Sequence, residues 1–311
     1  CAICVVCGVE LKRGWPVTDR GAFARIVSNR HFYIFVAPFF LLYAVLGVYP
    51  LIFSFAIGFA RWDGLSELRW IGLANASVML QDEHFAAAIW NTLVLGGLYV
   101  PPMIATAFVL ALLLDSATLR FRAAYRAAIF MPVIVPMVVV AIVFSFVFDL
   151  ENGFLNYIVK ALGLDPVPWL ISETWSKTAI AVLLVWRWSG YNMVLMLAGL
   201  QSIPRGLYDA ARIDGASAAR CLWHITLPHM RPVFSFCAIM SLIGTVFLFD
   251  EVFVLTNGGP GVSTLTIGLY IFDTSFVDFK FGYASMLAYA VAMVVFVLSI
   301  AVFRVQQRTE P

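Results

Sequence analysis

Long apolar stretches alternate with short polar segments along the chain, and six of these stretches are almost free of charge. A helix needs about 20 consecutive apolar residues to cross the hydrocarbon core of a bilayer. The pattern therefore predicts six membrane-spanning helices, at residues 32–60, 85–114, 127–148, 178–203, 232–249 and 281–303. Only the fourth stretch contains a charged residue, Arg187.

A seventh uncharged stretch, residues 252–272, is interrupted at its middle by residues 257–261, which include three glycines and a proline. Backbone groups that face lipid must be hydrogen-bonded internally, so a bare loop is not stable within the hydrocarbon. We expect this stretch to form a loop and a short helix, placed outside the membrane or against the helix bundle.

A polar and basic segment lies between the fourth and fifth predicted spans, and two short helices are expected in it. Ser202 and Pro204 suit the first turn of one helix, and Gly215 suits a left-handed residue after its end. Ser217 is expected to cap the second helix and Pro228 to end it. A helix of about a dozen residues is too short to cross a bilayer. The first helix must therefore lie along the membrane or dock on a partner.

The composition supports a membrane protein, because 62% of the residues are hydrophobic and only 12% are charged, against about 25% charged in soluble domains. The net charge of +2 gives no reason to expect a nucleic-acid partner. Of the 20 Lys and Arg residues, 14 lie before the first span, between the second and third, in the polar segment or after the last. Basic loops stay in the cytoplasm, so both termini and the polar segment are predicted to be cytoplasmic.

These predictions divide the chain into three parts. Residues 1–31 form a cytoplasmic tail, residues 32–303 form the six-span region with the polar segment at 201–231, and residues 304–311 form a second cytoplasmic tail. Three cysteines in the first tail, at positions 1, 4 and 7, have no fourth metal ligand nearby. We expect this tail to be disordered, or to come from a gene start placed too far upstream.

The fourth predicted span has the most polar interior of the six, at residues 186–192. A charge near the bilayer centre costs about 3 kcal/mol on insertion scales, so we expect Arg187 to face a wet cavity or a carboxylate of Asp250 or Glu251. Aromatic faces can cover the C–H surface of a sugar while amides and charges bond its hydroxyls. The predicted substrate path comprises Trp186, Arg187, Trp188, Gly190, Tyr191, Asn192, Asp250 and Glu251. The alternative is an interfacial aromatic belt from which Arg187 extends to water.

The polar segment resembles the cytoplasmic "EAA" loop of binding-protein-dependent ABC importer permeases, through Asp209-Ala210-Ala211, Gly215 and Ile225-Thr226-Leu227-Pro228. The family usually has Glu where this chain has Asp209. The resemblance implies an all-α, type I permease fold with a cytoplasmic coupling helix that docks on a separate ATPase. The coupling residues that it implies are Tyr208, Asp209, Ala210, Ala211, Asp214, Gly215, Ala216, Ile225, Leu227 and Pro228. The alternative is an ordinary amphipathic cytoplasmic linker.

Further motifs are similar to the carbohydrate-uptake branch of these permeases: Asn91-Thr92 and residues 200–204, 249–252 and 255–260. The likeness covers about residues 30–305 and implies a subunit of a sugar or polyol importer in the bacterial inner membrane. Its implied partners are a second permease in a heterodimer, two ATP-binding subunits and a periplasmic or surface solute-binding protein. Glycerol-phosphate esters are an alternative cargo, whose anion would meet Arg187. A secondary transporter driven by an ion gradient is the rival class, although the paired inverted repeats it would need are not found.

No catalytic or metal site is predicted. The sequence contains no Gly-Lys pair, and therefore no phosphate loop of the GxxxxGKS/T kind. It also lacks the HExxH and GxSxG patterns that mark zinc proteases and serine hydrolases. We therefore expect this chain to bind no cofactor, and ATP and Mg²⁺ to be used by the partner ATPase. A membrane-embedded enzyme or a scaffold remains a second rival, without an acid–base or nucleophile group to support it.

Overall fold

The computed structural model describes residues 30–116 and 120–309, so the predicted N-terminal tail lies almost wholly outside the described residues. The chain divides into two compact units after Ser54. The first unit contains helix α2 (Arg30–Tyr43), a π-helical turn (Ala44–Val48) and most of α3 (Tyr49–Ile57). Its apolar side chains from residue 34 onward are exposed, and residues 34–57 are long and apolar enough to cross a membrane.

After the end of α3, the second unit forms a short antiparallel hairpin of β1 (Ala60–Arg61) and β2 (Arg69–Trp70), followed by α4 (Ala74–Met79). The buried amide of Asn75 in α4 donates hydrogen bonds to the carbonyl oxygens of Gly58 (2.8 Å) and Ala60 (3.0 Å). These bonds attach α4 to the chain at the start of β1, the first strand of the hairpin.

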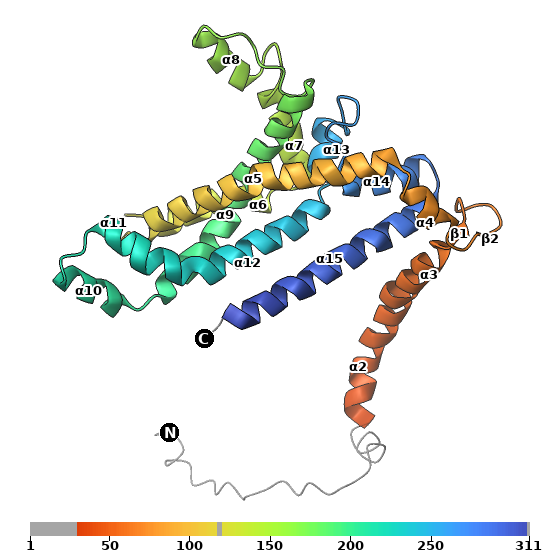
Figure 1. The fold of residues 1–311 in the computed structure, drawn as a ribbon, viewed down its shortest axis with the longest axis horizontal. Helices are drawn as coiled ribbons and strands as arrows, with labels where there is room; N and C mark the ends of the chain where they lie inside the picture. Colours follow the sequence, from red (N-terminus) through yellow and green to blue (C-terminus); the bar gives the residue numbers. More distant parts are fainter. Residues whose placement is uncertain (1–29, 117–119, 310–311) are drawn as a thin grey trace, which may run out of the picture. The chain divides into compact units, whose positions relative to one another are not determined.

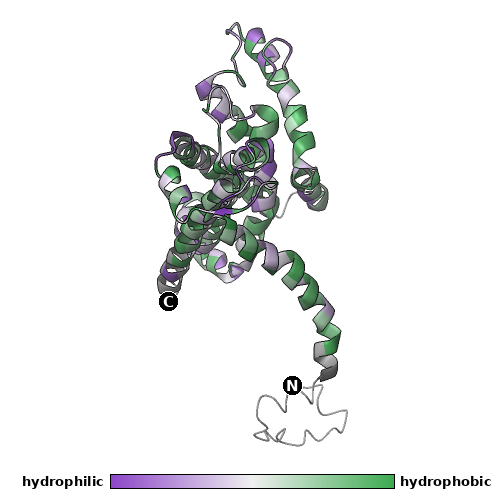
Figure 2. Cartoon of the chain, turned by 90° about the vertical axis from the view of Figure 1, so that its right-hand side faces the viewer, coloured by the Kyte–Doolittle hydropathy of each residue, from purple (hydrophilic) through white to green (hydrophobic). Residues whose placement is uncertain are grey.

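Long helices form the core of the second unit. Helices α5 (Glu83–Asp115), α9 (Glu173–Ser202) and α12 (Leu227–Val246) pack against one another (Figure 1). The fourth long helix of this unit is α15 (Phe281–Thr309). Apolar residues cover these helices, while hydrophilic residues gather at the loops and helix ends (Figure 2). Four of these helices qualify as spans: Glu83–Asp115, Glu173–Ser202, Ala218–Val246 and Phe281–Ile300.

The third predicted span, residues 127–148, is not one straight helix. It consists of α6 (Arg122–Ile134) and α7 (Met137–Val147), which are bent by 96°. Val135 is extended, and Pro136 has no N–H with which to continue α6. Counted as one bent span, this pair brings the candidate spans of the described chain to six, as the apolar pattern predicts. After α7, the chain forms α8 (Phe154–Ala161) before it enters α9.

The interrupted stretch at 252–272 forms α13 (Asp250–Leu255), a loop, and α14 (Ile267–Phe272), followed by a π-helical turn (Asp273–Val277). The loop packs against α5, because the Asn91 amide donates to the carbonyl oxygens of Val262 (2.7 Å) and Leu265 (3.1 Å). The prediction of a loop and a short helix packed on the bundle is confirmed.

The polar segment contains α10 (Arg205–Ile213) and α11 (Ala218–Cys221). Gly215 is left-handed, with φ +73°, and the Ser217 hydroxyl accepts from the N–H of Arg220, as predicted. Two other expectations are wrong. Ser202 is the last residue of α9, and the helix that Ser217 begins does not end at Pro228 but continues through a π-helical turn (Leu222–Thr226) into α12. Pro228 is the second residue of α12, directly after the π-helical turn, and it has no N–H to donate back into that turn.

An aspartate joins three elements next to the first residue of α5. One carboxylate oxygen of Asp82 accepts from the N–H groups of His84 (2.9 Å) and Phe85 (3.1 Å) and caps α5. The other oxygen accepts from the hydroxyls of Tyr270 in α14 and Tyr283 in α15. Partial burial raises the pKa of Asp82, but these hydrogen bonds outweigh it and hold the pKa below 3.8.

Replacing Asp82 with Asn is expected to lower the free energy of unfolding by about 1–2 kcal/mol at pH 7, because hydrogen bonds to a charged group are lost. A lowered folded-state pKa stabilises the fold at pH values above the unfolded-state pKa, and this contribution is lost as the pH falls through the folded-state pKa. The parent and the variant should therefore converge in stability once the pH falls below the folded-state pKa of Asp82, which is lower than its ordinary value. Thermal unfolding in nanodiscs across pH would measure this. Glu67→Gln, at an exposed carboxylate in the loop between β1 and β2, is the control and should have a smaller effect.

Candidate functional site

A cavity of about 640 Å³ opens between α5, α9, α12 and the start of α13. Six of the eight residues predicted for the substrate path line it: Arg187, Trp188, Tyr191, Asn192, Asp250 and Glu251. Helix α12 contributes mainly apolar side chains to the wall, including Phe236 and Met240. The fold thus brings polar residues from two distant parts of the sequence to one cavity.

Helix geometry explains which residues of α9 reach this cavity. Successive side chains of a helix point about 100° apart, so residues three and four apart share a face. Trp188 and Tyr191 are three apart, and their rings form an edge-to-face pair with centroids 6.1 Å apart. Asn192, four residues after Trp188, is buried and donates from its amide to the Trp188 carbonyl oxygen (3.0 Å). These three residues form one cavity-lining face.

Trp186 and Gly190 do not line the cavity, although both were predicted for the substrate path. The ring of Trp186 is 47% exposed and lies 5.1 Å from the ring of Phe144 in α7. A Cβ atom added to Gly190 would lie 2.1 Å from the carbonyl oxygen of Ile129 in α6. Gly190 is therefore the point where the backbones of α9 and α6 touch.

Arg187 is buried, with 8% of its surface exposed, and it lines the cavity. Within the described part of the chain, however, it forms no ion pair with Asp250 or Glu251. Its Nη1 atom donates to the carbonyl oxygens of Pro132 and Val135, both at 2.9 Å, and Nη2 donates to that of Val133 at 3.4 Å. Of the two predicted alternatives, Arg187 faces a cavity. Its direct partners are carbonyl oxygens at the bend between α6 and α7 rather than a carboxylate.

The two acidic residues begin α13, where the partial positive charge of a helix N-terminus favours carboxylates. Glu251 is buried and Asp250 is exposed, and both reach the cavity wall. They place two acidic side chains on the wall of the cavity that Arg187 also lines.

Tyr99 of α5 is a cavity residue that the sequence reasoning missed. Its hydroxyl donates to the Ser241 carbonyl oxygen (2.8 Å) and lies 3.0 Å from the Thr245 hydroxyl, so it ties α5 to α12. The available signal was that it is the single tyrosine of the second predicted span. No group of three or more His, Cys, Asp or Glu residues in the described chain is placed to hold a metal.

The polar segment presents α10 at the surface. The side chains of Asp209 and Arg212 are exposed, with Nη1 of Arg212 3.7 Å from Oδ1 of Asp209. The nearby Ile213 is 87% exposed. After α10 the N–H of Gly215 donates to the Arg212 carbonyl oxygen (3.1 Å), and the N–H of Ala216 donates to that of Ala211 (2.8 Å). These two bonds close the end of the helix.

The residues that the family resemblance assigned to coupling fall into two groups. Asp209, Ala210, Asp214 and Gly215 are exposed. The others are at least partly covered: Tyr208, Ala211, Ala216, Ile225, Leu227 and Pro228. The Tyr208 hydroxyl lies 2.9 Å from that of Thr226, and Tyr208 and Ile225 both pack against the apolar cluster between α5, α9 and α12. Tyr208 thus attaches α10 to the spans, and the exposed group remains open to a partner.

Comparison with known proteins gives the family. Residues 103–311 match the model of the binding-protein-dependent transport system inner membrane component. The chain belongs to this family. It is 37% identical to the lactose transport system permease LacF of Rhizobium radiobacter, over 87% of this chain and 92% of LacF. It is 34% identical to the arabinooligosaccharides transport system permease AraP of Bacillus subtilis, over 86% of each chain. A bacterial ABC transporter for the import of alginate has the same fold, with a TM-score of 0.81, 22% identity and coverage of 93% of this chain and 99% of that one.

Membership in this family settles the class of the protein. It is a multi-pass membrane permease, the transport subunit of an ATP-driven importer that works with a solute-binding protein and ATPase subunits, and it is not an enzyme. The rival class of ion-driven secondary transporters is not favoured.

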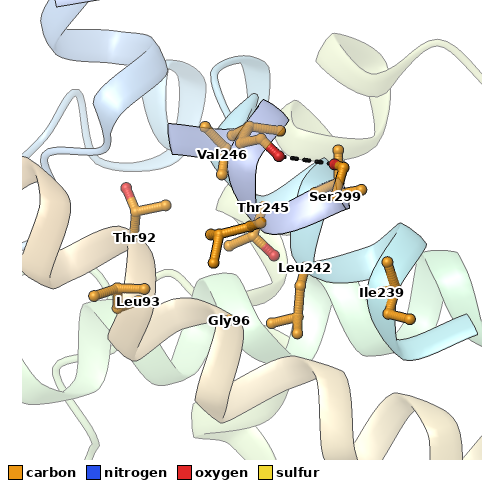
Figure 3. A pocket seen from close by; sticks show the side chains of 11 residues that line it. Thr92, Leu93, Gly96, Ile239, Leu242, Thr245, Val246 and Ser299 are labelled. Atoms are coloured by element: carbon orange, nitrogen blue, oxygen red, sulfur yellow. Dashed lines mark hydrogen bonds between the residues drawn. The ribbon is translucent and has the colours of Figure 1, made fainter. Parts of the chain in front are cut away.

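A second cavity of the permease has a different character. It has a volume of about 280 Å³, lies between α5, α12 and α15, and is lined mainly by apolar groups (Figure 3). Its hydroxyls already have partners within the protein, since Thr92 donates to the Ala88 carbonyl oxygen (2.7 Å) and Ser299 to that of Val295 (2.8 Å). This lining offers a hydrophilic cargo little to bind, so the larger cavity is the candidate site.

Proposed function

We propose that this permease carries a sugar or a polyol through the cavity between α5, α9, α12 and α13. The observation that carries the proposal is one face of α9 that presents the rings of Trp188 and Tyr191 beside the amide of Asn192. Rings cover the apolar faces of a sugar, and amides and charges bond its hydroxyls. The names of the lactose and arabinooligosaccharide relatives support the same class of cargo.

The charges of the cavity favour a neutral cargo over a glycerol-phosphate ester. Arg187 can offer five N–H groups, and three of its hydrogen bonds go to carbonyl oxygens of the bend. Asp250 and Glu251 lie on the wall of the same cavity, and their carboxylates would repel an anion where water is scarce.

The importer is proposed to be a complex of this chain, a second and different permease, two ATP-binding subunits and a solute-binding protein. Helix α10 would dock in a cleft of one ATPase through its exposed residues, among them Asp209 and Ile213. ATP and Mg²⁺ would bind the ATPase subunits, whose closure would push on α10 and switch the cavity between outward-facing and inward-facing states. This arrangement places α10 and both termini of the chain in the cytoplasm of a bacterial cell, in agreement with the distribution of Lys and Arg.

Two tryptophans of α9 provide a matched test of the cargo site. Trp188→Ala removes a ring from the cavity and is expected to raise the KM for sugar uptake about tenfold, equal to a loss of roughly 1.4 kcal/mol of binding. Trp186→Ala removes the same ring outside the cavity and should leave the KM within about twofold. Uptake of radiolabelled sugars by the assembled importer in vesicles would measure both.

If both substitutions change the KM for uptake by the same factor, the result would favour the alternative interpretation, in which Trp186 and Trp188 belong to an interfacial aromatic belt. Asp250→Ala gives an independent check, since it should also impair uptake or alter selectivity while the ATPase still binds. Unchanged kinetics in both Trp188→Ala and Asp250→Ala would contradict the proposed site.

A further inference from the structure

The bend between α6 and α7 stands apart from the other spans. Within the described chain, this is the one pair of helices in a candidate span that is bent by more than 40°, and the bend is 96°. Val135 at the bend is extended, with ψ 136°, and Pro136 precedes the first residue of α7. Such a break leaves carbonyl oxygens of the last helical turn without their usual donors.

The missing donors can be named. In a continuous helix the carbonyl oxygen of Pro132 would accept from the N–H of residue 136, but proline has none. That of Val135 would accept from the N–H of Val139, which instead donates to the Pro136 carbonyl oxygen at 3.1 Å. Within a membrane these oxygens need replacement donors from the protein, because lipid supplies none.

Arg187 supplies these donors from α9. The single atom Nη1 bonds the carbonyl oxygens of Pro132 and Val135, and Nη2 bonds that of Val133. A cation at the C-terminal end of α6 is also favoured by the helix dipole. One turn further along α9, Gly190 lets the backbones of α9 and α6 touch, so the end of α6 is held by both residues.

We propose that Arg187 is a positioning residue that holds the bend between α6 and α7 and ties it to the occupancy of the cavity. Three of the five N–H groups of its guanidinium are committed to the bend, and the residue is also part of the cavity wall. The guanidinium that holds the bend is therefore also the group to which a cargo hydroxyl in the cavity would bind. Helix α7 in turn packs against α13, which carries Glu251 of the cavity wall. This coupling rests on the proposed function, because it takes the cavity as the cargo site; the role of Arg187 in the bend does not.

Distance measurements on the bend test the first part. Spin labels would replace Tyr125 in α6 and Phe146 in α7, both exposed, in the assembled transporter without cargo and with the five native cysteines replaced. Arg187→Met removes all three donors and is expected to broaden the distance distribution and to shift its centre by more than its original width. An unchanged distribution in Arg187→Met would overturn the proposal.

Two further variants separate this role from general damage. Arg187→Lys keeps the cation and one nitrogen, and since Nη1 alone bonds two of the three carbonyl oxygens, Lys is expected to restore a distribution close to the parent one. Lys177→Met removes a cation from the same helix outside the cavity and should leave the distribution unchanged. If Arg187→Met does not assemble, the test rests on Arg187→Lys. A label-to-label distance distribution much broader than that of the parent counts against the proposal, and one as narrow as that of the parent supports it.

Uptake kinetics with lactose as the probe test the coupling to the cavity. Arg187→Met is expected to lower the maximal uptake rate on the order of tenfold with a smaller change in KM, and Arg187→Lys to restore most of that rate, because the lost donors serve a conformational step rather than cargo binding alone. A rise in KM alone, with unchanged label distances, would make Arg187 a simple cargo contact. Failure of the parent importer to carry any sugar would contradict the proposed function, whereas the label distances would still decide the role of Arg187 in the bend.

Discussion

Replacing Gly215 with proline is expected to abolish transport while the permease still inserts into the membrane. Gly215 has φ +73°, which proline cannot adopt because its ring fixes φ near −65°. The substitution also removes the N–H that donates to the Arg212 carbonyl oxygen. Without this closure, α10 loses its orientation on the spans and cannot transmit the motion of the ATPase. Co-purification of the ATPase subunits and sugar uptake in vesicles would measure the effect.

A matched glycine controls for the strain of the substitution. Gly163, after α8, has φ +76°, and its N–H donates to the Lys160 carbonyl oxygen at 3.0 Å. Gly163→Pro therefore breaks the same kind of helix end far from the polar segment in sequence, and co-purification of the ATPase should be unaffected. Normal sugar uptake by Gly215→Pro would contradict a role of the polar segment in coupling to the ATPase.

Replacing Gly190 with alanine is expected to lower the stability of the permease by about 3 kcal/mol or more, the upper range for overpacking of a close contact. The added Cβ atom would lie 2.1 Å from the Ile129 carbonyl oxygen and 2.9 Å from its carbon. Both are backbone atoms, so no side-chain rotation relieves the overlap and α9 must move away from α6. Thermal unfolding of the purified permease in nanodiscs, together with its yield in membranes, would measure the loss.

Gly97→Ala is the control for Gly190→Ala. Gly97 also lies within a long helix, α5, but a Cβ atom there meets nothing within 4 Å. Because alanine has a higher helix propensity than glycine, by about 1 kcal/mol, this substitution should leave stability unchanged or raise it. Equal unfolding temperatures for the two variants would show that α6 and α9 do not touch as closely as the structure indicates.

The apolar pattern predicts the spans well because their lengths are set by the thickness of the bilayer. The bend at Val135 and Pro136 was missed, since a proline in a span is compatible with a straight, kinked or broken helix. The arginine that satisfies the broken end comes from residue 187, more than 50 positions later in the chain. No local pattern joins those two places.

The residues of the candidate site also divide into those that the sequence predicts and those that only helix packing brings together. The polar character of residues 186–192 is visible in the sequence, but whether Trp186 or Trp188 faces the cavity depends on the rotation of α9 within the bundle. Tyr99 stayed hidden because it reaches Ser241 and Thr245 on another helix. The coupling residues were assigned through family resemblance, and their use by an ATPase stays a prediction.

The sequence by itself determined that this is a multi-pass helical membrane protein with a short polar helix between two spans, because run length, charge and end-capping residues act locally. Only the tertiary structure decided which face of α9 lines the cavity, where α6 breaks, and that a carbonyl cluster rather than a carboxylate accepts from Arg187. Those features depend on how helices rotate and approach one another. That packing is set by many contacts between distant residues, of which Gly190 against Ile129 is one.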